Sequence, residues 1–591
     1  AVPLSFQLHN PKIISVSKMF KIGIVGVGPR GLAALESLYV AKKNLDIQQP
    51  LQVLLFEASP YPGAGQIWSP DQVATNLSNI HERNLSNNLA GRKALSFDEV
   101  YLPQFPGYQE WLELNEGEAT GDQDHFPSRS KIGSYLNERF ETLKQALIGA
   151  GLLELYQHEV VQIEPEASGC TIVTKAGDHY KVDEVVLTIG HQPTYDSKQL
   201  SEWDVHAKKH NLKLYKDPYP VGALETDEIT PKTKIALRGF GLSMVDQVRA
   251  LSIGFGGEFV PISNSIEFEY KPSAEAPREL VAFSLNGLPP VPKPLSEAID
   301  TWFKPTPEEN ELLIKAIETA EANASEIKDA SFLIEAIAQI TSSIYQRLET
   351  KARTTDLSLE QLSALTLQLI KNPGHEHTLL VSHNTDPLEA MELYLNMACG
   401  KTDISLDYCL GQVWRFALSV LYHDYTYMNL GDDAMVDVVK YIEASKRYSY
   451  GPPVKSVQQL IALVKAEVLN LDFVKDPEIQ LIEEGWRLTK GVQSVDVDVM
   501  VNSVIDAPQL KAVSSSLVEH LREDKRVDAV SYKLGLHTLE DGRIISQGGN
   551  THQHIALLGR LAKGSVVGVD DLIECFGKPA RKWAEGVLKR V

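Results

Sequence analysis

Residues 21–38 read Lys21-Ile-Gly-Ile-Val-Gly-Val-Gly-Pro-Arg-Gly-Leu-Ala-Ala-Leu-Glu-Ser-Leu38, an apolar strand that runs into a glycine-rich turn and an apolar helix. Gly26 permits a tight turn, and Gly31 lets the helix pack closely on the strand. Gly28 removes a side chain, so that the phosphates of a ligand can approach the backbone at the positive N-terminal end of the helix. This pattern of three glycines predicts a dinucleotide-binding turn.

The next predicted strand strengthens this interpretation. Residues 51–56 are mainly apolar, and Glu57 follows them, 26 residues after Gly31. A carboxylate at about this position binds the ribose hydroxyls in dinucleotide-binding folds. The alternative is a tight strand–helix turn in an α/β protein that binds no nucleotide. The order of strand, glycine turn, helix, strand and acid favours the dinucleotide.

Size and composition exclude several classes of function. A chain of 591 residues is too long for one core and predicts roughly three to four domain-sized units. The 57 basic and 78 acidic residues give a net charge of −21, which disfavours binding to nucleic acids and anionic membranes. The sequence contains neither a long apolar run nor the pattern of a signal peptide, so we expect a cytoplasmic protein.

No motif in this sequence supports a metal site or a hydrolase. His375 and His377 are separated by one residue, but no third ligand accompanies them, so we expect no metal site. Neither a Gly-x-Ser-x-Gly nor a His-Glu-x-x-His motif is present. No Cys-x-x-Cys pair is present either, which predicts reduced thiols rather than disulfides or zinc. The four cysteines are Cys170, Cys399, Cys409 and Cys575.

A second strand–turn–helix pattern begins at Lys234. It keeps two glycines, Gly239 and Gly241, but Met244 stands where the third glycine is expected. Two dinucleotide turns in one chain are typical of enzymes that bind a flavin and a nicotinamide nucleotide. The alternative is a single dinucleotide, with a second turn that is purely structural.

The segment after the second turn is predicted to be mostly helical. Residues 331–353 repeat apolar residues at helical spacing, and Ser358 and Gln361 have the spacing of a capping box. Pro387 follows Asp386 where another helix is expected to start. The chain then returns to α/β patterns. The expected units are an extension (1–18), a discontinuous first dinucleotide-binding domain (19–230 plus 485–591), a second dinucleotide-binding-like region (231–304) and a mostly helical region (305–484).

Several stretches together resemble a known family. It is the bacterial FAD/NAD(P)-binding family that includes FAD-dependent urate hydroxylase and the aspartate N-monooxygenase of diazo-compound biosynthesis. The resemblance implies an α/β fold, namely a Rossmann-like flavoprotein with two dinucleotide sites and a mostly helical insertion. The stretches that carry it are Ile24–Gly31, Pro62–Trp68, Phe126–Leu136, Val186–His191, Gly239–Asp246, Phe283–Pro289 and Leu558–Gly564.

The resemblance implies a set of residues around FAD. In the glycine-rich loop from Pro62 to Trp68, Gly65 leaves room for the isoalloxazine ring and Trp68 lies along it. A core aromatic is the alternative for Trp68. The residues implied at the pyrophosphate and the adenosine ribose are Gly26, Gly28, Pro29, Arg30, Gly31, Glu57 and Ala58.

Further positions follow from the same resemblance. Asn76 matches a family asparagine and is expected to contact the flavin, with a turn asparagine as the alternative. Arg129 is expected to face an anion, with a solvated surface arginine as the alternative. The terminal turn lacks the usual acid of the family, and Arg560 stands nearby. The remaining implied cofactor-binding residues are Gly190, Gly239, Gly241, Ser243, Gly559 and Gly564.

The sequence therefore predicts an FAD-dependent oxidoreductase, most simply a monooxygenase that uses NADPH or NADH and O₂ to hydroxylate a small polar substrate. The oxygen chemistry belongs to the flavin, so no catalytic side chain is assigned. Two alternatives stay open: a flavin dehydrogenase or reductase that does not activate oxygen, and a flavin-binding protein whose helical region binds a partner. We expect no nucleic-acid or membrane partner, and the sequence leaves open a homo-oligomer.

Overall fold

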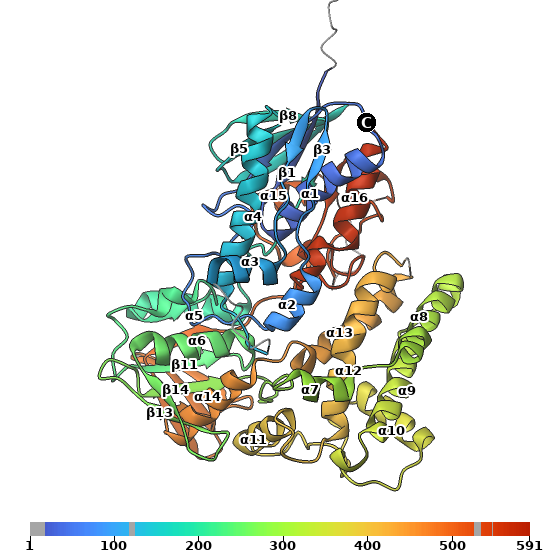
Figure 1. Ribbon diagram of the computed structural model, residues 1–591. Helices are drawn as coiled ribbons and strands as arrows, with labels where there is room; N and C mark the ends of the chain where they lie inside the picture. The colour runs from blue at the N-terminus through green and yellow to red at the C-terminus, as the bar shows by residue number, and fades with distance from the viewer. Residues whose placement is uncertain (1–17, 117–123, 429, 525–526, 528–533, 547) are drawn as a thin grey trace, which may run out of the picture.

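The computed structural model describes residues 18–116, 124–428, 430–524, 527, 534–546 and 548–591. Three units are visible in Figure 1: an upper unit that combines both ends of the described chain, a lower unit around β11 and β14, and a helical unit beside it. The expected N-terminal extension lies outside the described residues, apart from Lys18. The predicted α/β class with a mostly helical insertion is confirmed.

The first unit is built on a six-stranded sheet. Its strands run parallel except for the pair β20–β21. On β2, Val53 and Leu55 face one core, and Leu54 and Phe56 face another, because successive side chains of a strand alternate between the two faces. In spatial order the strands are β20 (Arg543–Ile545), β21 (Thr551–Leu557), β9 (Glu184–Leu187), β1 (Phe20–Val25), β2 (Leu51–Phe56) and β5 (Leu153–Tyr156).

Both faces of this sheet are covered. One core contains side chains of α1, α3, α4 and α16, and the other contains those of a three-stranded antiparallel sheet and α15. The helices of the unit are α1 (Pro29–Asn44), α2 (Glu82–Asn88), α3 (Tyr108–Glu116), α4 (Arg129–Gly149), α15 (Ser516–Glu523) and α16 (Lys578–Leu588). Its remaining strands are β3 (Leu95–Phe97), β4 (Val100–Leu102), β6 (Val160–Glu166), β7 (Gly169–Thr174) and β8 (His179–Val182).

The second unit holds a five-stranded parallel sheet. In spatial order its strands are β10 (Lys213–Tyr215), β19 (Val499–Asn502), β11 (Lys234–Arg238), β14 (Glu279–Phe283) and β15 (Leu469–Asn470). The unit also has a hairpin of β12 (Glu258–Pro261) and β13 (Phe268–Lys271), and a small sheet of β16 (Glu478–Ile482), β17 (Gly485–Lys490) and β18 (Gln493–Val497). Its helices are α5 (Lys198–His210), α6 (Leu242–Ser252) and α14 (Val454–Lys465).

The strand pairing moves the boundaries that the sequence suggested. β10 and β19 both lie in the sheet of β11, although residues 213–215 and 499–502 were expected in the first unit. The second unit therefore takes strands from both sides of the helical insertion. Pairing between segments far apart in the sequence leaves no local signal, because an apolar strand fits either sheet equally well.

Only helices, short turns of helix and loops occur among the described residues from 297 to 465. Thr306 and Ser358 each begin a helix with a capping box, the second as predicted. Asp386 caps the helix that starts at Pro387, also as predicted. The helices are α7 (Glu297–Asp300), α8 (Pro307–Ala322), α9 (Ser331–Arg347), α10 (Leu359–Lys371), α11 (Pro387–Ala398), α12 (Leu406–Val420) and α13 (Asp432–Ser449).

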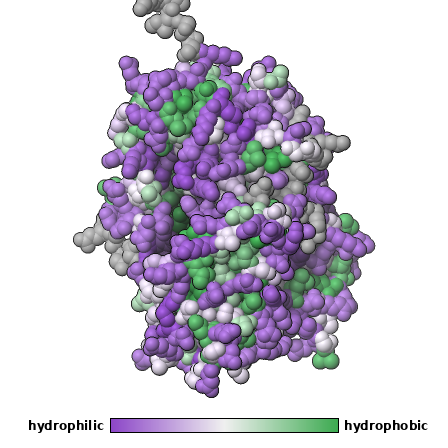
Figure 2. All heavy atoms as spheres, turned by 90° about the vertical axis from the view of Figure 1, so that its right-hand side faces the viewer, coloured by the Kyte–Doolittle hydropathy of each residue, from purple (hydrophilic) through white to green (hydrophobic). Residues whose placement is uncertain are grey.

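The visible surface carries both hydrophilic and hydrophobic side chains (Figure 2). On the face in Figure 2, hydrophilic side chains dominate and hydrophobic ones lie in separate groups among them. All four cysteines are buried. In the described part of the chain, no helix combines the length and the apolar character that a membrane crossing requires.

Candidate active site at the junction of the three units

The first glycine turn joins β1 to α1 in the geometry that its sequence predicts. Gly26 has a φ of +89°, and a Cβ on it would lie 2.5 Å from the Thr188 carbonyl oxygen. A Cβ on Gly31 would lie 2.4 Å from the Gly26 carbonyl oxygen. Both positions therefore need glycine for the turn itself, because any side chain would collide with the backbone.

Gly28 has a different environment. A Cβ built on it would meet nothing closer than 3.9 Å, the distance to the Ala64 oxygen and the Gly65 Cα. Gly28 caps α1 without a side-chain hydrogen bond, and Pro29 occupies the first turn. The amide groups at the start of α1 are thus not capped by a side chain. The open space beside them fits the phosphates of a dinucleotide.

Glu57 lies next to this turn. Its two carboxylate oxygens accept the backbone N–H groups of Val27, at 2.5 Å, and Ser59, at 3.0 Å. The strand β2 therefore ends with a fixed carboxylate beside the glycine turn, which is where a ribose-binding acid is expected. Each oxygen keeps a further lone pair for a ligand hydroxyl.

Arg30 is held by the C-terminal part of the chain. Its Nη2 donates to the carbonyl oxygens of Gly568, at 3.3 Å, and Val569, at 3.1 Å. Its side chain also passes against Gly559, where a Cβ would lie 2.6 Å from the Arg30 Cδ. The implied contact of Arg30 with a pyrophosphate stays a prediction, and the observed bonds tie α1 to the terminal turn.

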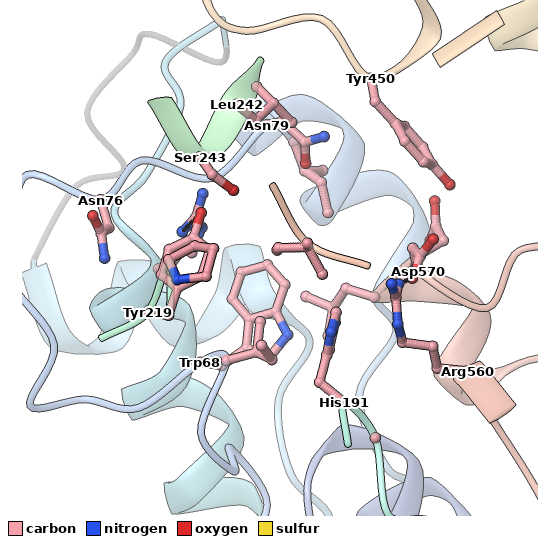
Figure 3. A pocket seen from close by; sticks show the side chains of 18 of the residues that line it. Trp68, Asn76, Asn79, His191, Tyr219, Leu242, Ser243, Tyr450, Arg560 and Asp570 are labelled. Carbon is pink, nitrogen blue, oxygen red and sulfur yellow. Dashed lines mark hydrogen bonds and ion pairs between the residues drawn. The ribbon is translucent and has the colours of Figure 1, made fainter. Parts of the chain in front are cut away.

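One large cavity opens where the three units meet, with a volume of about 1760 Å³. Figure 3 shows Trp68, Tyr219, His191 and Asn79 around it, with Asp570 and Arg560 on the right. The cavity is lined by these of the predicted residues: Ala58, Gly65, Trp68, Asn76, Arg129, Gly190 and Ser243. The other predicted residues are not part of its lining: Gly26, Gly28, Pro29, Arg30, Gly31, Glu57, Gly239, Gly241, Gly559 and Gly564.

The Asn76 side chain is buried and only partly hydrogen-bonded. It is 2% exposed, and its Nδ2 donates to Gln72 at 3.0 Å. Its buried Oδ1 has no hydrogen-bond partner among the described residues. A buried acceptor without a partner costs free energy, and an N–H of a bound flavin would satisfy it. The residues at this site therefore fit FAD.

The flavin loop is positioned by a glycine that the sequence analysis did not single out. Gly133 of α4 packs against the Trp68 carbonyl oxygen so closely that a Cβ would lie 1.6 Å from it. Within the hollow of Figure 3, the Trp68 indole lies between His191 and Tyr219. The resemblance stretch containing Gly133 was the available signal, but contact across 65 residues cannot be read from spacing.

Arg129 is not a solvated surface side chain, and its expected contact with a ligand anion stays a prediction. Its Nη2 lies 2.7 Å from the Asp246 carboxylate, and the Tyr219 hydroxyl donates to the same Oδ2 at 2.5 Å. Although burial opposes the charge, Asp246 and Tyr219 raise the pKa of Arg129. The ion pair joins the start of α4 in the first unit to α6 in the second. Asp246 ends one of the stretches that carry the resemblance, whereas Tyr219 gave no signal in the sequence.

The second glycine turn keeps part of the dinucleotide geometry. Gly239 has a φ of +135°, and a Cβ there would lie 2.9 Å from the Ser503 Cβ. Gly241 caps α6 without a side-chain bond, and Ser243 lines the cavity. Met244, in place of the third glycine, is fully buried in the hydrophobic core of this unit.

The terminal turn supplies charge to the cavity wall. Gly559 and Gly564 have φ values of +103° and +114°. Between them, Arg560 forms an ion pair with Asp570, which also pairs with Lys446 of α13 at 2.8 Å. Despite burial, these two cations lower the pKa of Asp570. An acid, Asp570, thus lies beside Arg560, ten residues after it in the chain, and both line the cavity.

Residues 23–192 match a family model described as FAD-NAD(P)-binding. The nitrosuccinic acid synthase npaA of Aspergillus oryzae is 24% identical over 92% of this chain and 88% of its own length. An L-aspartate N-monooxygenase (nitrosuccinate-forming) of Streptomyces davaonensis is 25% identical, over 46% of this chain and 44% of its own length.

Among solved structures, the reduced form of the ornithine hydroxylase of Pseudomonas aeruginosa aligns with a TM-score of 0.46 and 13% identity. The alignment covers 97% of this chain and 99% of the other. The first glycine turn, Glu57 and β9 all fall inside the matched range 23–192, as does Asn76, whose Oδ1 has no partner among the described residues. The part of the chain from 23 to 192, which holds the first glycine turn, is therefore similar to the FAD-NAD(P)-binding family.

Proposed function

We propose that this protein is an FAD-dependent monooxygenase that uses NAD(P)H and O₂ to oxygenate the amino group of a small amino acid. One observation carries the proposal: a single cavity reaches from Ala58 and Gly65, beside the first dinucleotide turn, to Leu242 and Ser243, at the start of the second. A nucleotide in each turn would bring a flavin and a nicotinamide into the same enclosed space, as hydride transfer requires.

The amino group as the site of oxygenation is suggested by the relatives. The names of two of them give nitrosuccinate or nitrosuccinic acid as product, and one names L-aspartate as substrate. The first step of such a reaction is balanced as R–NH₂ + O₂ + NAD(P)H + H⁺ → R–NHOH + H₂O + NAD(P)⁺. L-Aspartate is therefore the first substrate to test.

The residues of this chain would bind and orient the cofactors and the substrate, and would exclude water. Bound FAD would supply the two-electron chemistry with NAD(P)H and the activation of O₂. The start of α1 and Glu57 would hold the pyrophosphate and ribose, and Asn76 Oδ1 would accept from the flavin edge. Trp68 would cover the ring from the side of the cavity. A bound substrate would lie among side chains of all three units, which would limit the access of water to the reacting atoms.

The test is a coupled assay on the purified protein. We expect a yellow protein whose flavin is bleached anaerobically by NADPH or NADH. On admission of O₂, L-aspartate should lower the peroxide released per NAD(P)H and yield an N-oxidised product. Bleaching without any coupled product would favour the dehydrogenase or reductase alternative. A flavin that neither nucleotide bleaches would favour the binding-protein alternative. The cytoplasmic location and the oligomeric state stay predictions.

A further inference from the structure

One wall of the cavity carries a buried lysine without a counter-ion. Lys293 is 9% exposed and lines the cavity, and its Nζ donates to the Asn79 carbonyl oxygen. Among the described residues, its amine forms an ion pair with no carboxylate. Burying an ammonium group is costly unless a negative charge accompanies it. The position therefore calls for an anion that the protein itself does not supply.

The nearby carboxylates are already engaged. Asp300 binds two arginines, Arg83 at 3.0 Å and Arg415 on its other oxygen. Arg83 also pairs with Asp124. Asp571 lies within electrostatic reach of Lys293, but its Oδ1 accepts the backbone N–H groups of residues 573 and 574, at 2.8 and 3.2 Å.

Two further titratable groups of this wall, His81 and Glu574, form no ion pair with Lys293 in the described part of the chain. His81 contacts Arg83 at 2.9 Å, and burial together with Arg83 and Lys293 lowers its pKa to about 3, so it stays neutral. Burial and Asp571 raise the pKa of Glu574 to about 7. The wall therefore presents a cationic surface to the cavity, with Lys293 as its unpaired member.

We propose that Lys293, flanked by Arg83 and Arg415, is the subsite that binds a carboxylate of the substrate and so selects an acidic amino acid. This inference rests on the proposed function, and it names the residues that recognise the substrate. The three cations come from three segments that are far apart in sequence: α2, the loop before α7, and α12. Asp300 holds the two arginines in place, so they contribute fixed positive charge. The Lys293 amine adds a further positive charge and N–H groups that can donate to a carboxylate.

The acid–base behaviour of Lys293 provides an independent readout. Burial and Arg415 lower its pKa to about 7, against the opposing effects of Asp571 and Asp300. A bound carboxylate favours the charged amine and raises that pKa again. Binding at pH 8 should therefore be accompanied by proton uptake, which calorimetry in buffers of different ionisation enthalpy measures.

The experiment uses the FAD-loaded enzyme and three variants: Lys293→Met, Lys293→Arg and the control Lys328→Met. Lys328 is an exposed lysine remote in sequence that donates only to the Ser325 carbonyl oxygen. We measure binding of L-aspartate, L-glutamate, succinate and L-asparagine at pH 8. We expect Lys293→Met to weaken L-aspartate binding about tenfold or more, to affect L-asparagine much less, and to abolish proton uptake. Lys293→Arg should keep most of the affinity.

The possible results of these binding measurements lead to different conclusions. Equal L-aspartate affinity in wild type and Lys293→Met overturns the inference, even when NAD(P)H reduces the flavin normally. Loss of FAD or of NAD(P)H affinity in Lys293→Met also overturns it, because the lysine would then serve a cofactor phosphate. A wild type that binds none of the three dicarboxylates, L-aspartate, L-glutamate and succinate, overturns it as well. Failure of NAD(P)H to reduce the wild-type flavin instead counts against the proposed function.

Discussion

At the scale of single residues, the glycines of the first turn divide into two kinds. Gly26 and Gly31 are required by the protein backbone, since added side chains would collide with carbonyl oxygens. Gly28 is not, because the space beside it is open within the protein. Folding alone therefore does not require glycine at position 28, which fits the predicted approach of a nucleotide phosphate there.

This difference predicts the effect of Gly28→Val. The variant should fold normally, yet retain less than about a tenth of the FAD, because the valine would fill the space that the phosphates need. Absorbance measures the FAD content, which tests cofactor retention. Calorimetry measures the melting temperature, which tests folding. Gly149→Val is the matched control, because no atom lies within 4 Å of a Cβ there. Full FAD retention by Gly28→Val would contradict the assignment of this turn.

Lys293 predicts a stability effect that depends on pH. Its pKa is lowered from 10.5 to about 7, so below pH 7 the folded protein must bury a charge that the unfolded chain solvates. That penalty is fully present below pH 7 and fades as the pH rises towards 10.5. Without substrate, Lys293→Met should therefore stabilise the protein by on the order of 2 kcal/mol at pH 6, and less at pH 9. Denaturant unfolding at both pH values measures this, and a variant that is equally stable or less stable at pH 6 would refute it.

At the scale of elements, buried contacts between units hold the cavity walls in place. The ion pair of Arg129 with Asp246 connects α4 to α6, and the side chains of its two partners are 15% and 5% exposed. Removing one member of such a pair leaves the other charge buried and uncompensated. Loss of either residue should therefore disturb how the first and second units are placed relative to each other.

Arg129→Met should destabilise the protein by about 3 kcal/mol. The double variant Arg129→Met with Asp246→Asn should recover part of this loss, because no buried charge then lacks a partner. Chemical denaturation of the two variants and of wild type provides the comparison. A loss below about 1 kcal/mol in the single variant, or no recovery in the double one, would show that the pair does not hold the units together.

Gly133→Ala tests the support of the flavin loop. A Cβ 1.6 Å from the Trp68 carbonyl oxygen cannot be accommodated without displacing the loop or the helix. We expect weaker FAD binding and altered tryptophan fluorescence with the helix content retained. Gly149→Ala, at the end of the same helix, controls for the change from glycine to alanine, because no atom lies within 4 Å of a Cβ there. Unchanged fluorescence and FAD affinity would mean that Gly133 does not set the position of Trp68.

At the scale of the whole molecule, the sequence predicts what is local and misses what is distant. The turn at Gly26, the acid at Glu57 and the capping box at Ser358 were all predictable, because each depends on residues close together in the chain. The place of β19 in the second sheet was not, because strand pairing spans the helical insertion. The cationic wall around Lys293 gave no signal for the same reason.

The central claim concerns two nucleotides that meet in one cavity, and anaerobic stopped-flow reduction of the FAD-loaded protein tests it most directly. The account predicts that NADPH or NADH bleaches the flavin absorbance with a rate that saturates with nucleotide concentration. Saturation is expected because the nucleotide must first bind at the second turn, beside Ser243. Stoichiometric FAD that neither nucleotide bleaches would contradict the account.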